Sequence, residues 1–109
     1  MATINYLYPV SGAAPSQKAS NTVTRVMAQV IGSTADTTFT ITHNFNASTY
    51  DLANGWPEVR IQWTVAPTST AGLIGWSVGG ATVVGTVVGG TGSGYTGIVT
   101  IERPHTIVR

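Results

Sequence analysis

A G-x-G-x-x-G spacing, the pattern of dinucleotide-binding loops, occurs at residues 92–97 as Gly-Ser-Gly-Tyr-Thr-Gly. The pattern binds a pyrophosphate only where it follows a strand and opens a helix, because the phosphate lies on the free N–H groups of the helix N-terminus. The residues that follow it, IVTIERPHTIVR, are rich in β-branched side chains and interrupted by Pro104. The Gly-Lys-Ser/Thr ending of a phosphate-binding loop is also missing. The sequence therefore predicts a glycine-rich hairpin loop here, without a nucleotide.

Catalysis and metal binding need several titratable side chains in one place, and this sequence contains few of them. The carboxylates and imidazoles are Asp36, Asp51, Glu58, Glu102, His43 and His105. No second His or carboxylate stands at a ligand spacing such as i, i+2 from His43, which predicts a core or interface histidine with a hydrogen bond. The chain has no cysteine, which excludes thiolate chemistry, and it has no nucleophile elbow. We therefore expect a protein that is not an enzyme and binds no metal or cofactor.

Charge is scarce: charged residues make up 8% of the chain, against about 25% in typical soluble domains. The net charge is +1, and the five basic residues are scattered, so we expect no direct contact with nucleic acid. No charged residue lies between Arg60 and Glu102. Monomers normally keep a charged surface, whereas charge is depleted in the core of protein interfaces. The composition therefore indicates a permanent assembly, and we expect a homo-oligomer such as a trimer.

The apolar segment 72–90, GLIGWSVGGATVVGTVVGG, is about long enough to span a membrane as a helix. It even contains G-x-x-x-G spacings, which bring membrane helices together. Glycine and β-branched residues favour strands with tight turns, however, and no Lys or Arg flanks the segment. We expect strands and no membrane contact, with a small membrane-embedded protein as an alternative.

Strand signals dominate the rest of the chain. Apolar and polar residues alternate in TTFTITHNF, residues 37–45, and in EVRIQWTVA, residues 58–66, which is typical of half-buried antiparallel strands. TVTRVMAQVIG, residues 22–32, fits a helical face as well, but its β-branched content favours a strand. Gly79-Gly80 predicts a type I′ turn in a hairpin, within a three-stranded meander from about residue 72 to 103. One short helix is expected near 47–54, with Ser48 or Asn46 as its cap.

The sequence thus predicts an all-β fold, an antiparallel β-sandwich or jelly-roll-like domain with one short helix. Residues 22–109 would form this single domain, and residues 1–21 an N-terminal strand or arm plus a linker, since SGAAPSQKASN is small and polar. An arm would anchor on a neighbouring subunit through its large side chains, whereas an ordinary first strand would stay in its own sandwich. The candidate assembly contacts are Tyr6, Leu7, Tyr8, Trp56 and Trp76.

Four stretches together resemble small virion structural proteins of tailed bacteriophages: MATINYLYPV, ITHNF, NGWPEV and VTIERPHTIVR. The resemblance spans most of the chain. It implies a β-rich, non-enzymatic protein with no catalytic residues, located in the virion as a capsid decoration or cement protein or as a part of the tail. The major capsid protein, or another virion protein, would be the partner. A carbohydrate-binding sandwich that uses Trp56 or Trp76 is a further alternative.

Overall fold

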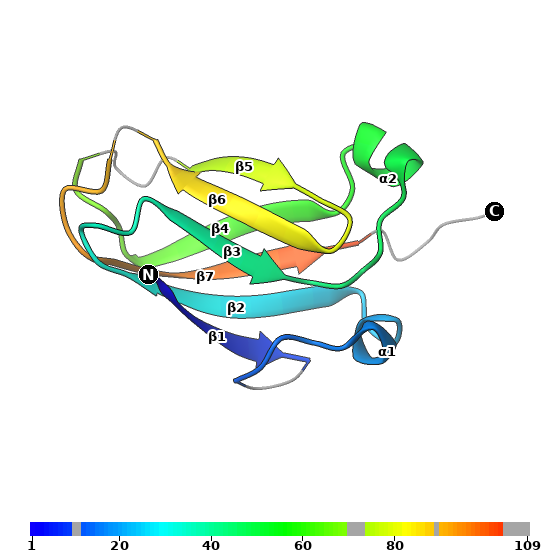
Figure 1. The fold of residues 1–109 in the computed structure, drawn as a ribbon. Helices are drawn as coiled ribbons and strands as arrows, with labels where there is room; N and C mark the ends of the chain where they lie inside the picture. The colour runs from blue at the N-terminus through cyan, green and yellow to red at the C-terminus, as the bar shows by residue number, and fades with distance from the viewer. Residues whose placement is uncertain (10–11, 70–73, 89, 104–109) are drawn as a thin grey trace.

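The computed structural model describes residues 1–9, 12–69, 74–88 and 90–103. The elements within these residues are β1 (Thr3–Tyr8), α1 (Gln17–Ser20), β2 (Arg25–Gly32), β3 (Thr38–Thr42), α2 (Thr49–Ala53), β4 (Glu58–Val65), β5 (Ile74–Val78), β6 (Thr82–Val87) and β7 (Tyr95–Glu102). Two antiparallel sheets face each other, a four-stranded sheet of order β1-β2-β7-β4 and a three-stranded sheet of order β3-β6-β5 (Figure 1). The all-β sandwich expected from the sequence is confirmed.

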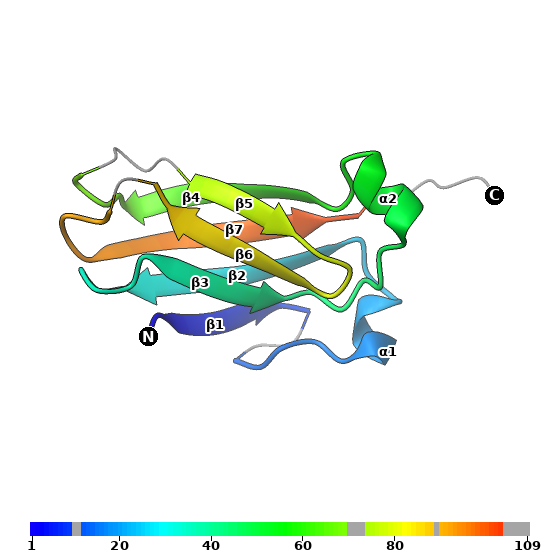
Figure 2. The same ribbon diagram turned by 45° about the horizontal axis from the view of Figure 1, so that its top comes forward.

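The strand pairs are nested along the chain, as in a jelly roll. β2 pairs with β7, β3 pairs with β6, and β4 and β5 lie between these partners in the sequence. The predicted meander of three neighbouring strands is wrong in one respect. β5 and β6 form a hairpin, but β7 crosses to the other sheet and pairs with both β2 and β4 (Figure 2).

The core lies between the sheets and is formed by alternate residues of the strands. Burial in β3 and the loop that follows it obeys the predicted period of two, since Phe39, Ile41, His43 and Phe45 are all buried. β7 repeats the pattern, and its Tyr95 ring packs edge-on against Trp63 with ring centroids 5.7 Å apart. β4 is an edge strand and its inward side chains are only half-buried, with Val65 exposed.

The short helix α2 was predicted, and its capping residue is Ser48. The Ser48 hydroxyl accepts a hydrogen bond from the Asp51 N–H at 3.1 Å, and the Asp51 carboxylate accepts one from the Ser48 N–H at 3.0 Å. This reciprocal pair is a capping box. Gly55 follows the helix with φ +79°, a conformation that glycine adopts at helix ends without strain.

A second short helix, α1, lies where the sequence predicted only a linker. Ser16 caps it, since its hydroxyl accepts the Ala19 N–H at 3.1 Å. The segment is also fastened to the sandwich, because Ser20 is fully buried and its hydroxyl donates to the His43 carbonyl at 2.5 Å. The expected linker is therefore part of the folded domain.

The hairpin between β5 and β6 exists, but the predicted type I′ turn at Gly79-Gly80 is wrong. Neither glycine has φ in the left-handed region. The Gly79 N–H donates to the Thr82 carbonyl at 2.8 Å, which leaves Gly80 and Ala81 as the two turn residues. A Cβ on Gly80 would lie 3.0 Å from the Ala47 carbonyl oxygen, so close packing favours glycine there.

Candidate interaction surface

The titratable residues are dispersed and serve structural roles. In the described part of the chain, no group of three or more His, Cys, Asp or Glu side chains lies close enough to hold a metal ion. Arg60 and Glu102 form an ion pair on neighbouring strands. The Asp36 carboxylate accepts the Ser33 N–H at 2.8 Å and lies 2.9 Å from the Met1 amino group. The Ser33 N–H, and next the Met1 amino group, lower the pKa of Asp36 below its usual value.

His43 is a buried histidine with both ring nitrogens occupied. The Phe45 N–H donates to Nδ1 at 3.0 Å, so Nε2 carries the proton and donates to the Gly79 carbonyl at 3.0 Å. Desolvation lowers the pKa of His43 below its usual value of 6.5, partly offset by the hydrogen bond to Gly79. The imidazole is therefore a neutral link between the end of β3 and the β5–β6 turn, and it has no free nitrogen for a metal.

Acid is expected to destabilise the fold through His43. The pKa of His43 is lower in the folded chain than in the unfolded chain, where it is about 6.5, so the unfolded chain takes up the proton first. His43 therefore contributes stability above about pH 6.5, and this contribution is lost as the pH falls toward the pKa of the folded chain. The slope is at most about 1.4 kcal/mol per pH unit for one group. Denaturant melts of the parent and of His43→Gln between pH 7.5 and 5 would measure it. Equal slopes in the two proteins would contradict this role for His43.

The G-x-G-x-x-G segment has the structure of a loop followed by a strand. Gly92 lies in the loop with φ +69°, and Gly97 lies within β7. A Cβ on Gly97 would lie 3.0 Å from the Ile61 and Trp63 side chains, so this glycine makes room for β4. No helix follows the motif in the described residues up to 103. The expected loop is present without the geometry that binds a pyrophosphate.

The five candidate assembly contacts differ in burial: one is buried, two are exposed and two are half-buried. Tyr6 is in the core, with 9% of its surface exposed, and its hydroxyl accepts the Thr42 N–H at 3.0 Å. Tyr6 thus packs within its own sandwich, where β1 is an edge strand, and a contact from Tyr6 to another subunit stays a prediction. Leu7 and Tyr8 are exposed, and Tyr8 stacks on the Arg25 guanidinium. Trp56 is half-buried.

Trp76 is half-buried as well, and its ring packs edge-on against Phe39 with centroids 5.8 Å apart. This contact gives Trp76 a structural role in the core. Assembly roles for Leu7, Tyr8, Trp56 and Trp76 stay predictions.

The described part of segment 72–90 forms β5 and β6 and not a helix. No helix within the described residues is long and apolar enough to cross a membrane. The strands β3, β5 and β6 contain no Asp, Glu, Lys or Arg, so the three-stranded sheet carries no charge on either face. Its outer face consists of threonine, serine, glycine and valine. The charged residues of the described strands, Arg25, Glu58, Arg60 and Glu102, all lie in the four-stranded sheet.

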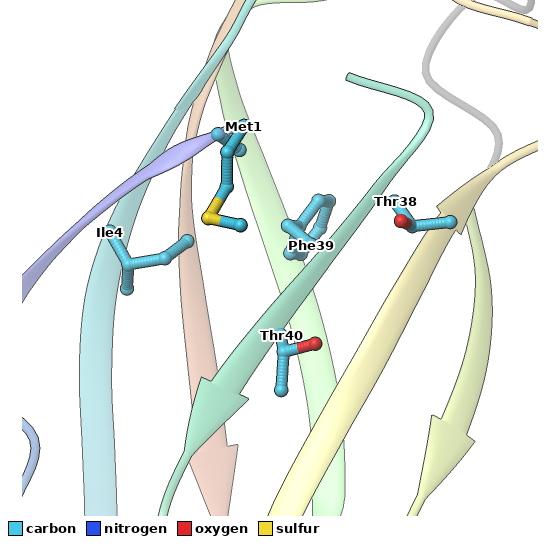
Figure 3. A pocket seen from close by; sticks show the side chains of 6 residues that line it. Met1, Ile4, Thr38, Phe39 and Thr40 are labelled. Carbon is cyan, nitrogen blue, oxygen red and sulfur yellow. The ribbon is translucent and has the colours of Figure 1, made fainter.

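A groove opens between the edges of the two sheets, along β1 and β3 (Figure 3). Its volume is about 270 Å³, and the side chains along it are Met1, Ala2, Ile4, Thr38, Phe39 and Thr40. Sequence reasoning did not predict this groove. The available signal was TFTIT, a strand without the charges that usually protect a sheet edge.

Comparisons with protein families, with curated proteins and with solved structures find no match for this chain.

Proposed function

We propose that the protein is a non-enzymatic structural component of a virion, and that it decorates the capsid of a tailed phage. The observation that carries this proposal is the uncharged three-stranded sheet of β3, β6 and β5. Charge keeps the surface of a free monomer soluble, and it is depleted where proteins remain in contact. The uncharged sheet therefore supports the proposal that the protein acts through lasting contact with neighbouring subunits.

The virion assignment is supported by the resemblance of MATINYLYPV, ITHNF, NGWPEV and VTIERPHTIVR to small phage structural proteins. The dispersed carboxylates and the fully bonded His43 agree with a role that needs no catalysis. A tail or fibre protein would use the same contact chemistry on a different partner.

In this proposal the protein stabilises the capsid through contact alone, without a chemical step. Each copy bridges neighbouring copies of the major capsid protein and buries apolar surface worth roughly 25 cal/mol per Å². Because it binds the assembled shell and not the dissociated subunits, it shifts the equilibrium toward the shell and offsets the outward load of packaged DNA.

The purified protein is expected to form a homotrimer or a larger assembly at micromolar concentration, because its uncharged sheet is poorly suited to a free monomer. Light scattering would give at least three times the chain mass of 11.3 kDa. Sedimentation with purified empty capsids and, separately, with purified tails would identify the partner. A monomeric mass together with no binding to either particle would contradict the proposal, and binding to tails alone would select the tail.

A further inference from the structure

The edges of the sandwich are protected unequally. β1 has a register shift between Tyr6 and Tyr8, and the Gly12 N–H bonds to the Tyr6 carbonyl. β4 has a register shift near its end and carries two charged residues, Glu58 and Arg60. Bulges and charges of this kind keep other strands from pairing with an edge. β3 and β5, the two edges of the three-stranded sheet, both have a regular register and no charge, and β3 is the one that borders the groove.

The hydrogen-bond register of β3 shows which of its backbone groups are unpaired. The Val87 N–H donates to the Thr37 carbonyl at 2.8 Å, which places residues 37, 39 and 41 in the hydrogen-bonded positions opposite β6. The backbone groups of Thr38 and Thr40 therefore point away from β6, toward the groove side. Neither residue bonds to another described residue at this edge. Two N–H groups and two carbonyls are thus available to one more strand.

The N-terminal segment contacts β3 and the loop before it on either side of Thr38 and Thr40. On one side the Tyr6 hydroxyl accepts the Thr42 N–H, and on the other the Met1 amino group pairs with Asp36. Figure 3 shows the side chains of Met1, Ile4 and Phe39 gathered between β1 and β3, with Thr38 and Thr40 along β3. The lining of the groove is mostly apolar, and the amino group of Met1, one of its residues, is already paired with Asp36.

We propose that this groove is a peptide-binding site, which accepts an extended, uncharged segment of a partner protein as a further strand on β3. Backbone groups of the segment pair with those of Thr38 and Thr40, as in β-augmentation. Because side chains of a strand alternate between its faces, one apolar side chain of the segment enters the groove against Ile4 and Phe39. An acidic or basic side chain at that position would be desolvated without a partner. The site does not depend on which assembly contains the protein.

The test uses a random library of nine-residue peptides selected against the parent protein. The expected peptides have an apolar residue at one fixed position with uncharged neighbours. When bound, they slow amide hydrogen exchange at Thr38 and Thr40. Thr40→Pro removes an edge N–H without touching the ladder to β6, so it should weaken binding about tenfold or more. Thr40→Val loses the same hydroxyl but keeps the N–H, and it should bind like the parent.

The proposal is overturned if no peptide is recovered, if selected peptides bind Thr40→Pro as tightly as the parent, or if they protect amides elsewhere. A thermal melt of Thr40→Pro checks that it folds. If it does not fold, exchange at Thr38 and Thr40 in the parent decides the question: protection by the peptide supports the site, and unchanged exchange rejects it.

Discussion

Tyr6→Ala is expected to lower the free energy of unfolding by about 4 kcal/mol. Removing a buried aromatic side chain costs about 3–5 kcal/mol, and the Thr42 N–H loses its hydrogen-bond partner as well. Tyr6→Phe, which removes only the hydroxyl, should cost about 1 kcal/mol. Leu7→Ala is the matched control, because Leu7 is exposed and should change stability by less than about 1 kcal/mol. Urea denaturation of the four proteins gives these values.

This prediction decides between an arm and a strand at the N-terminus. An arm on a neighbouring subunit would leave the isolated domain as stable after Tyr6→Ala as before. Deleting residues 2–16 extends the test, since it removes β1 from its sheet and should abolish cooperative melting. A truncated protein that melts cooperatively near the parent temperature would reject the structural role of β1.

Gly32→Ala is expected to destabilise the fold by about 3 kcal/mol, at the upper end of the range for overpacking. A Cβ on Gly32 would lie 2.1 Å from the Tyr95 ring. Tyr95 cannot easily move away, because it is buried and its hydroxyl donates to the Asp36 carbonyl at 2.6 Å. The contact therefore displaces the ring or the backbone of β2.

Gly75→Ala provides the control for Gly32→Ala. It places the same methyl group on a strand, but its nearest neighbour is a Val88 methyl at 3.6 Å, an ordinary contact. It should leave the melting temperature unchanged within a few degrees. If both substitutions had the same effect, the packing of Tyr95 over Gly32 would be wrong.

Local patterns predicted the strands because period-two alternation depends on neighbouring residues alone. Phe39, Ile41 and His43 were placed on the buried face in this way, and the cap of α2 at Ser48 was available from local hydrogen-bonding rules. Features that depend on distant residues were missed. α1 is held by the hydrogen bond from Ser20 to His43, 23 positions away.

The position of β7 in a different sheet from β5 and β6 was missed for the same reason, since its pairing with β2 joins segments about 70 residues apart. The sequence left the role of INYLYPV open because an edge strand and an arm have the same pattern. The groove beside β3 was not predicted, because it depends on how the edges of the two sheets come to lie together.

The most direct test of the account is calorimetry of purified empty capsids with increasing amounts of the protein. A decoration protein binds the assembled shell in preference to its free subunits, so the melting temperature of the shell should rise with protein concentration until the sites are filled. The matched control is the same calorimetry with Tyr6→Ala in place of the parent, under conditions in which this variant is unfolded. A shell that melts at the same temperature with and without saturating folded protein would contradict the proposal.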